Sequence, residues 1–307
     1  MTKILVTGGA GFIGSNLVDA LVSQGHEVSV VDNLSNGNRA NLNPAAKFFE
    51  LDITDEKLAE VFEQEKPSVV FHLAAQIDVR KSVTDPVWDA KQNIFGSINL
   101  LENCRKYGVK KFVFSSSGGA IYGDTDQVPT KEGHPELPIS PYGIAKLAVE
   151  KYLYYYHQIF GLSYVALRYA NVYGPRQSTR GEAGVVAIFS DRLLHCQNPV
   201  INGDGSQTRD YVFVGDVVKA NLAALASDKI GIYNIATAIE TTVNQLAELI
   251  KINIGTDSDF THGQVKPGEQ QRSCLDYHLA QAELGWRSQT DLASGIKQTV
   301  EWFKANQ

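Results

Sequence analysis

A tyrosine and a lysine four residues apart, Tyr142 and Lys146, are the residues of this sequence whose types and spacing best suit acid–base chemistry. Residues at this spacing share one face of a helix, so the phenol and the ammonium would project to the same side. A tyrosine titrates near ~10, too high for a base at neutral pH, and a neighbouring cation stabilises its phenolate. Lowering the tyrosine pKa by ~3 units requires about 4 kcal/mol of differential interaction. Such spacing is common on helix surfaces, so the rest of the chain must decide the role of this pair.

A run of serines upstream of the pair favours a catalytic role. Ser115, Ser116 and Ser117 lie at the end of an expected strand that begins at Lys111. A serine hydroxyl at a strand end can hydrogen-bond the substrate hydroxyl that the tyrosine deprotonates, and orient it for reaction. We assign this role to Ser117, with Ser116 as the alternative.

The N-terminal segment has the pattern of a phosphate-binding turn. Residues suited to a buried strand, Ile4–Thr7, run into glycines at positions 8, 9, 11 and 14, and a helical pattern follows. Such glycines let backbone N–H groups approach a pyrophosphate, and the helix N-terminus adds favourable partial charge. A second expected strand, Val28–Val31, ends in Asp32. Its carboxylate can accept hydrogen bonds from ribose hydroxyls and would repel a 2′-phosphate, which predicts NAD rather than NADP.

The expected elements that position these residues alternate between strand and helix. Strands are expected at Ile4–Thr7, Val28–Val31, Lys47–Leu51, Val69–His72, Lys111–Ser115 and Ser163–Arg168, and helices over about 55–65, 88–107 and 140–160. This alternation predicts an α/β fold with a doubly wound parallel sheet of the Rossmann type. Later helices are expected at Val185–Cys196, Asp216–Ser227, Val243–Ile254 and Leu292–Phe303.

Past Asn171 the regularity loosens, and this change suggests two regions. We expect an NAD-binding domain over residues 1–170 that carries the catalytic residues. A smaller C-terminal α/β region over residues 171–307 would bind the substrate, with some of its segments returning to the sheet. The cleft between the two parts is the expected active site, because ligands of such folds bind at the carboxyl ends of the strands.

Composition weighs against several classes of function. The 307 residues are 43% apolar and 20% charged, which is ordinary for a globular protein. The net charge is −6 and no block of Lys or Arg suggests a nucleic-acid partner. No apolar run approaches the ~18–20 residues of a membrane span, and because the first expected strand begins at Ile4 we expect no signal peptide. Cys104, Cys196 and Cys274 lack metal-ligand spacing, so we expect reduced thiols, no metal and a cytoplasmic location.

Together these motifs carry a resemblance that runs nearly end to end. The set Gly8-x-x-Gly11-x-x-Gly14, Asp32, Asp52-Ile53, His72-Leu-Ala-Ala75, Ser117 and Tyr142-x-x-x-Lys146 resembles the extended short-chain dehydrogenase/reductases. The segments Asp32–Gly37, Leu167–Pro175 and Gly203–Tyr211 narrow it to the nucleotide-sugar epimerase/dehydratase branch, where it is most similar to the UDP-glucose (UDP-galactose) 4-epimerases. The resemblance implies an isomerase, a homodimer in which NAD-dependent C4 epimerisation of a UDP-hexose passes through a transient 4-keto sugar.

The resemblance also implies a role for each matching residue. NAD would contact Gly8, Gly11, Phe12, Ile13 and Gly14 at the pyrophosphate, Asp32, Asn33, Ser35, Asn36 and Gly37 at the adenosine ribose, Asp52 and Ile53 at the adenine, and Leu73, Ala74, Ala75, Gln76, Asn93, Ser115, Tyr142, Lys146 and Tyr169 toward the nicotinamide. The UDP-sugar would contact Ser117, Asn171, Asn202, Arg209, Lys266, Glu269, Arg272 and Ser273.

One departure from the family pattern and one position that varies within the family bear on the substrate. Lys266-Pro-Gly-Glu269 stands where the family carries Arg-x-Gly-Asp, so charge is kept while bidentate geometry is lost, and Arg272 would compensate. Beside the C2 substituent of the sugar, where the family carries a bulky or a small residue, this chain has Ser273. A small residue leaves room for an N-acetyl group, so we expect activity on UDP-GlcNAc and UDP-GalNAc alongside the plain hexoses.

Other functions occur on the same fold, and the residues after Ser117 bear on several of them. A nucleotide-sugar 4,6-dehydratase needs Asp-Glu just after the catalytic serine, and a UDP-glucuronate decarboxylase also needs a Glu there; this chain has Gly118 and Gly119. A UDP-glucuronate 4-epimerase stays open, because Arg80, Lys81 or Arg176 could pair with a C6 carboxylate. A catalytically silent NAD-binding scaffold is the alternative from another class, and the presence of the serine, the tyrosine and the lysine favours an enzyme.

Overall fold

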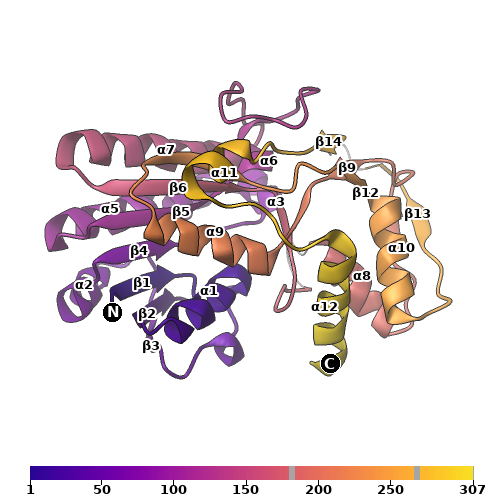
Figure 1. Ribbon diagram of the computed structural model, residues 1–307, viewed down its shortest axis with the longest axis horizontal. Helices are drawn as coiled ribbons and strands as arrows, with labels where there is room; N and C mark the ends of the chain where they lie inside the picture. Colours follow the sequence, from indigo (N-terminus) through magenta and orange to yellow (C-terminus); the bar gives the residue numbers. More distant parts are fainter. Residues whose placement is uncertain (180–183, 266–269, 307) are drawn as a thin grey trace.

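A seven-stranded parallel sheet runs through the computed structural model, which describes residues 1–179, 184–265 and 270–306 (Figure 1). Its strands are β1 (Lys3–Thr7), β2 (Glu27–Asp32), β3 (Lys47–Glu50), β4 (Val69–His72), β5 (Lys111–Ser117), β6 (Ser163–Tyr169) and β11 (Gly231–Ile235). They lie in the order β11-β6-β5-β4-β1-β2-β3, and every neighbouring pair is parallel. The strand order reverses beside β1, which is where folds of this kind bind ligands. The predicted doubly wound sheet is confirmed.

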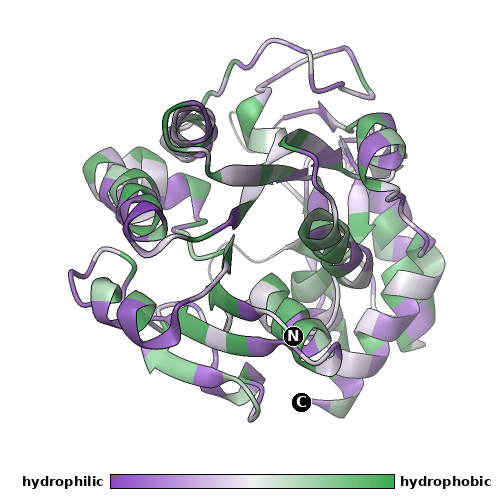
Figure 2. Cartoon of the chain, turned by 60° about the vertical axis from the view of Figure 1, so that its left-hand side comes forward, coloured by the Kyte–Doolittle hydropathy of each residue, from purple (hydrophilic) through white to green (hydrophobic). Residues whose placement is uncertain are grey.

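Helices cover both faces of this sheet. On one face lie α1 (Phe12–Ser23), α9 (Val214–Ala226) and α11 (His278–Leu284); on the other lie α2 (Leu58–Glu65), α5 (Gly96–Tyr107) and α7 (Pro141–Phe160). Each face has its own core of Val, Leu, Ile and Phe side chains, for example Leu17 with Val217 and Leu101 with Leu153. Figure 2 shows hydrophobic and hydrophilic residues side by side along these helices, as expected for helices with one buried face.

The helix expected over 88–107 is divided in the structure. It consists of α4 (Pro86–Ala90), a π-helical turn η2 (Lys91–Phe95) and α5, and a short helix α3 (Val79–Thr84) precedes it. Asp85 caps α4 by accepting a hydrogen bond from the Trp88 N–H at 2.9 Å, and Pro86 occupies the first position of α4. The helix therefore begins at Pro86, before the position that apolar spacing alone indicates.

The chain beyond β6 forms a third core at one end of the sheet. Its helices are α8 (Val185–Leu194), α10 (Val243–Ile254) and α12 (Leu292–Ala305). Short strands accompany them: β7 (Asn171–Tyr173) with β10 (Tyr211–Phe213), β8 (Val200–Asn202) with β13 (Thr261–Gly263), and β9 (Thr208–Arg209) with β12 (Thr241–Thr242) and β14 (Arg272–Ser273). Because β7 follows directly on β6, this part begins at the carboxyl end of the sheet. The division at residue 170 stays a prediction, and β11, α9 and α11 come from beyond it.

A short helix, α6 (Gly118–Ile121), leaves the end of β5, and an irregular segment over residues 122–140 leads to α7. The segment is attached to the C-terminal region by a bridge between Thr130 and Leu275. In the described part of the chain, no helix combines the length and the apolarity needed to cross a bilayer.

Candidate active site

The glycine turn after β1 forms a cradle that only glycines can line. A Cβ at Gly8, whose φ is +73°, would lie 2.6 Å from the Ala74 nitrogen, and a Cβ at Gly14 would lie 2.1 Å from the Gly8 oxygen. No side chain caps the start of α1, and its first turn holds no acidic residue. The N–H groups of Phe12, Ile13 and Gly14 therefore lack intrahelical acceptors. An uncapped helix N-terminus behind glycines fits the pyrophosphate of a dinucleotide.

The carboxylate of Asp32 stands at the end of β2 beside this cradle. Its oxygens accept hydrogen bonds from the backbone N–H groups of Ala10 (3.0 Å) and Leu34 (2.8 Å). Burial raises the pKa of Asp32, and the two backbone donors oppose that shift. A Cβ at Gly37 would lie 2.8 Å from Asp32 Oδ1, so a glycine is needed there. Each carboxylate oxygen can still accept from a ribose hydroxyl, because it has two lone-pair directions.

The other residues expected at the adenosine end gather beside Asp32. The Asn33 side chain donates to Asp52 at 2.7 Å, and the Ser35 N–H donates to Asn33 Oδ1 at 3.0 Å. Ile53 is buried, and Asn36 is exposed in the same turn. Sequence reasoning therefore brought together residues that are neighbours in space.

The segment after β4 carries the small residues expected near the nicotinamide. Leu73, Ala74 and Ala75 lie next to the turn, where the Ala74 N–H contacts Thr7 Oγ1 at 3.3 Å. Gln76 and Asn93 then hold each other: the Gln76 N–H donates to Asn93 Oδ1 (2.8 Å), and Asn93 Nδ2 donates to the Gln76 oxygen (2.9 Å). The Asn93 side chain thus binds both backbone groups of Gln76 and fixes the path of the backbone behind the cofactor site.

Tyr142 and Lys146 occupy the first two turns of α7. Ser140 caps this helix by accepting from the Gly143 N–H at 3.1 Å, and Pro141 begins it. The Lys146 side chain is buried; its Nζ donates to the Ser115 oxygen at 2.7 Å and lies 5.7 Å from the centre of the Tyr142 ring. The cap and the proline thus start the helix at the residue that directs both side chains toward the end of β5.

The electrostatics around this pair oppose ionisation in the absence of a bound cation. Burial raises the pKa of Tyr142, and the carboxylate of Asp89 raises it further, whereas a hydrogen bond with Ser117 lowers it. Burial lowers the pKa of Lys146 to about 8, and Asp89 and Glu150 act against that shift. A further positive charge, in addition to that of Lys146, would therefore be required beside the phenol for Tyr142 to act as a base near neutral pH.

The serines at the end of β5 point to different partners. Ser117 is partly exposed and hydrogen-bonds Tyr142. Ser116 is buried on the opposite side of the strand, where its hydroxyl donates to Glu150 Oε1 at 2.6 Å. Because neighbouring residues of a strand face opposite sides, this geometry favours Ser117 for the catalytic role.

Tyr169, expected beside the nicotinamide, is the last residue of β6 and is buried; its hydroxyl contacts Asn221 of α9 at 2.9 Å, and burial raises its pKa to about 12. The residues expected on the substrate side are spread over the C-terminal elements. Asn171 is exposed at the start of β7, and Asn202 and Arg209 are partly exposed on β8 and β9. The Arg272 guanidinium pairs with Glu240 at 2.6 Å. Lys266 and Glu269 lie outside the described residues.

A small cavity joins the catalytic segment to β14. It is lined by residues of α6 and the segment after it together with Ser273, Cys274 and Leu275. A Cβ at Gly119 would lie 3.4 Å from Ser273 Oγ, and the Gln270 side chain donates to the Gly123 oxygen at 2.7 Å. Gly119 and Ser273 are thus direct neighbours across the cavity.

Sequence reasoning missed the residues that act from behind the site, above all Asp89 and Asn221. An acidic residue one helical turn before Asn93 is the only sequence signal for Asp89, because that spacing puts both on one face.

Among residues 1–179, 184–265 and 270–306, no group of three His, Cys, Asp or Glu side chains could hold a metal.

Comparisons with known proteins agree with this geometry. The NAD dependent epimerase/dehydratase family matches residues 4–236. The UDP-glucose 4-epimerase of Thermotoga maritima, solved with UDP-glucose, is 52% identical with a TM-score of 0.97 over 99% of both chains. The Thermus thermophilus UDP-glucose 4-epimerase, solved with NAD, is 44% identical with a TM-score of 0.94 over 98% of both.

A third similar structure acts on an acetylated sugar nucleotide. It is the UDP-N-acetylglucosamine 4-epimerase of Methanobrevibacter ruminantium, solved with UDP-N-acetylmuramic acid; it is 36% identical with a TM-score of 0.95, over 100% of this chain and 99% of that one. The predicted enzyme class and the predicted cofactor, NAD, are confirmed by these matches. The chain belongs to the NAD dependent epimerase/dehydratase family.

Proposed function

We propose that this enzyme inverts the C4 centre of UDP-hexoses, acting on UDP-Glc/UDP-Gal and on UDP-GlcNAc/UDP-GalNAc. The observation that carries the proposal is the convergence of Ser117, Tyr142 and Lys146 at the end of β5, with two glycines immediately after the serine. Tyr142 can remove a proton from the substrate, but Gly118 and Gly119 stand where a dehydratase needs a second acid–base pair. Inversion of C4 with no net redox change needs only the proton transfer by Tyr142.

Each residue has a defined task in this reaction. Ser117 hydrogen-bonds the C4 hydroxyl and Tyr142 accepts its proton, while the buried Lys146 ammonium stabilises the phenolate and binds ribose hydroxyls. When bound, NAD would supply the acceptor, and later the donor, of the hydride at C4. The 4-keto sugar turns over while its UDP stays bound, so that C4 presents its opposite face when the hydride returns, and Tyr142 gives the proton back to O4. Asn171, Asn202, Arg209, Lys266, Glu269, Arg272 and Ser273 are the proposed contacts to UDP and the sugar.

Packing around Gly118 argues against a dehydratase. A Cβ at Gly118 would lie 2.3 Å from Leu275 Cδ1, so an aspartate fits there only if the buried Leu275 side chain moves aside. Gly118 and Gly119 leave these positions without the carboxylates that such enzymes need. This weighs against elimination chemistry and against decarboxylation at the same position.

The two arginines that could pair with the C6 carboxylate of UDP-glucuronate already have carboxylate neighbours in the protein. Arg176 pairs with Asp19 at 2.7 Å, and Arg80 lies 3.5 Å from the Asp78 carboxylate. Both arginines would have to exchange these partners to hold a glucuronate. The small, buried Ser273 beside Gly119 instead supports a sugar with a bulky C2 substituent.

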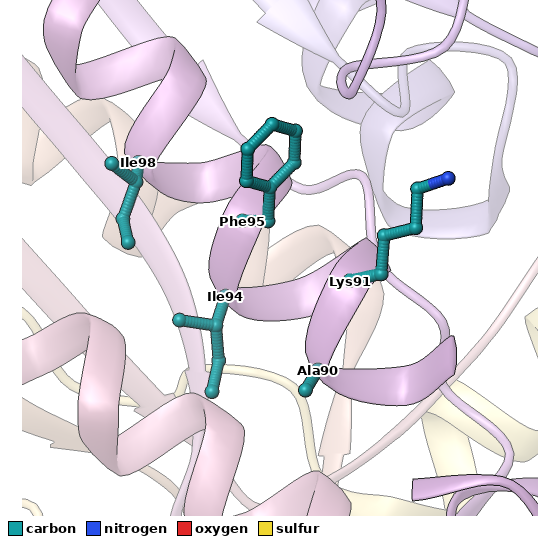
Figure 3. A pocket seen from close by; sticks show the side chains of 5 residues that line it. All are labelled: Ala90, Lys91, Ile94, Phe95 and Ile98. Carbon is teal, nitrogen blue, oxygen red and sulfur yellow. The ribbon is translucent and has the colours of Figure 1, made fainter. Parts of the chain in front are cut away.

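We further propose that two copies pair through α7 and the helical segment from α4 to α5. Figure 3 shows a pocket on this segment lined by Ala90, Lys91, Ile94, Phe95 and Ile98. Phe95 and Ile144 are each 53% exposed and Ile159 is 61% exposed, so the two adjacent helices share an apolar face. A second copy of the chain would bury it. Phe95→Glu should give a monomer in sedimentation experiments, and Ile252→Glu, at an exposed apolar residue of α10, should not.

We also place the enzyme in the cytoplasm. Cys104, Cys196 and Cys274 are all free thiols in the structure, which suits a reducing compartment. Fractionation of the source cells would test this location.

The function is tested by NMR of the purified protein with UDP-Gal, UDP-GalNAc and UDP-GlcA in separate tubes, with no NAD added. Conversion of the first two to their C4 epimers supports the proposal and a tightly bound cofactor. Conversion of UDP-GlcA alone would favour the glucuronate alternative, and a 4-keto-6-deoxy product would favour a dehydratase. Silence with all three, even after NAD is added, would leave an NAD-binding scaffold as the better explanation.

A further inference from the structure

Asp89 on α4 is a buried carboxylate that is only half satisfied. It is 1% exposed, and its Oδ1 accepts hydrogen bonds from Gln76 Nε2 and Asn93 Nδ2, both at 2.9 Å. Its Oδ2 is buried and has no hydrogen-bond partner within the described residues. A buried charged oxygen without a partner is costly. The fold keeps this energetically unfavourable oxygen directly behind the catalytic site, which indicates that Asp89 has a function there.

The surroundings of Asp89 identify the cation that it faces. Helix α4 packs against α7, and Asp89 acts electrostatically on both Tyr142 and Lys146. Glu150 is the other carboxylate that acts on Lys146, and it is already engaged in an ion pair with Arg168 at 2.5 Å. No such ion pair joins Asp89 to an Arg or Lys anywhere in the part of the chain that is described. The Lys146 ammonium is therefore the charge that Asp89 is left to balance.

We propose that Asp89 is a positioning residue of the active site, the counter-ion that keeps Lys146 charged inside the protein and keeps Tyr142 protonated until a positively charged nicotinamide is bound. This inference rests on the proposed function of the Tyr142–Lys146 pair. Without a dinucleotide, the negative charge of Asp89 and the positive charge of Lys146 offset each other beside the Tyr142 phenol. Binding of a cationic ring adds a positive charge that Asp89 alone does not cancel, so the phenolate becomes favourable.

Hydrogen bonds link the Asp89 carboxylate to the residues beside the cofactor site. Through Oδ1 it holds the Gln76 and Asn93 amides, which in turn fix the backbone after β4. The other titratable or charged groups on α3, η2 and α7, which pack against α4, are Arg80, Lys81, Lys91, Lys151, Tyr152, Tyr154, Tyr155, Tyr156 and His157, and Asp78 and Asp85 flank α3. His72, at the end of β4, is held neutral by burial, which lowers its pKa to about 3.

The substitution Asp89→Asn tests the charge while keeping an acceptor oxygen for the two amides. Removing the negative charge should make Tyr142 easier to ionise and Lys146 easier to deprotonate. Both limbs of the pH profile of kcat should therefore move to lower pH, by roughly half a unit to one unit for a partly screened charge. The ultraviolet absorption of the Tyr142 phenolate, taken as the difference from Tyr142→Phe, should show the same direction of shift in protein without substrate.

A matched control separates charge from structure. Asp216 is a buried carboxylate of α9 that accepts hydrogen bonds from Ser288, Gln289 and Thr290. Asp216→Asn should lower the melting temperature and leave both limbs in place. If Asp89→Asn behaves in the same way, the proposal is overturned. The phenolate titration needs no turnover, so an inactive wild-type protein would contradict the proposed function without deciding this inference.

A second measurement applies if Asp89→Asn alone folds poorly. A counter-ion becomes superfluous when its cation is removed, so Asp89→Asn should lower the urea midpoint much less in a Lys146→Met background than in the wild type. Equal losses in the two backgrounds would contradict the pairing of Asp89 with Lys146.

Discussion

Arg168 of β6 and Glu150 of α7 form an ion pair whose side chains are both 0% exposed, with a nitrogen–oxygen distance of 2.5 Å. Glu150 lies one helical turn beyond Lys146 and also accepts the hydroxyl of Ser116. Arg168 reaches Glu136 in the segment before α7 and donates to the Tyr122 hydroxyl at 2.9 Å. The pair therefore links the helix that carries the catalytic side chains to strands β5 and β6 beneath it.

Replacing Arg168 with methionine should destabilise the protein by about 3–5 kcal/mol, because it leaves a buried, unpaired carboxylate at Glu150. Urea unfolding at neutral pH measures the loss. Arg39 supplies the control, since its pair with Glu50 is more than half exposed and Arg39→Met should cost under about 1 kcal/mol. Equal effects of the two substitutions would contradict a central role for the buried pair.

The two serines of β5 should give opposite phenotypes. Ser117→Ala should lower kcat by about 10²–10⁴-fold and leave stability nearly unchanged, because it removes the hydroxyl that orients the substrate. Ser116→Ala should instead lower stability by about 1 kcal/mol through the lost bond to Glu150, with a small effect on kcat. Steady-state kinetics and thermal melts of both variants check this, and the reverse pattern would exchange their roles.

The sequence was sufficient for the fold and for identifying the residues that we propose to contact ligands, and it was insufficient for the residues behind them. Glycine spacing, Asp32 and the Tyr142–Lys146 pair can be interpreted from the sequence because each obeys a local rule of backbone or helix geometry. The ion pair of Arg168 with Glu150 and the contact of Asp89 with Gln76 join residues from separate elements, and no local pattern specifies them. The strand Gly231–Ile235 was missed because it completes the sheet only after a long excursion through the C-terminal region.

Acidification should destabilise the fold through His72. Burial lowers the pKa of His72 to about 3 from its usual 6.5, while its ring contacts Thr7 at 2.8 Å and Ser97 at 2.9 Å. Below pH 6.5 the unfolded chain therefore binds a proton at His72 that the folded protein does not bind. The free energy of unfolding falls as the pH drops. At about pH 5 the loss is about 2 kcal/mol. Urea midpoints at neutral and acid pH should differ less for His72→Gln than for the wild type; an unchanged difference would contradict this.

The glycine cradle predicts which substitution abolishes cofactor retention. A Cβ at Gly14 would lie 2.1 Å from the Gly8 oxygen, so Gly14→Ala must displace α1 from the turn and with it the N–H groups for the pyrophosphate. The purified variant should carry no NAD, as measured by cofactor release and absorbance. Gly133→Ala is the control, because nothing lies within 4 Å of a Cβ there. Full NAD occupancy in Gly14→Ala would contradict the cradle as the pyrophosphate site.

Substrate size should be set at Ser273, which is buried and faces Gly119 across the cavity beside the catalytic segment. Ser273→Tyr would fill the space for an N-acetyl group, while a C2 hydroxyl needs much less room. We expect kcat/KM for UDP-GalNAc to fall by about 10²-fold or more, and that for UDP-Gal to change by only a few fold. Ser206→Tyr, at an exposed serine, should leave the ratio of the two unchanged. A parallel loss on both substrates would instead mean that Ser273 supports the pocket as a whole, because steric exclusion of one C2 substituent must discriminate between them.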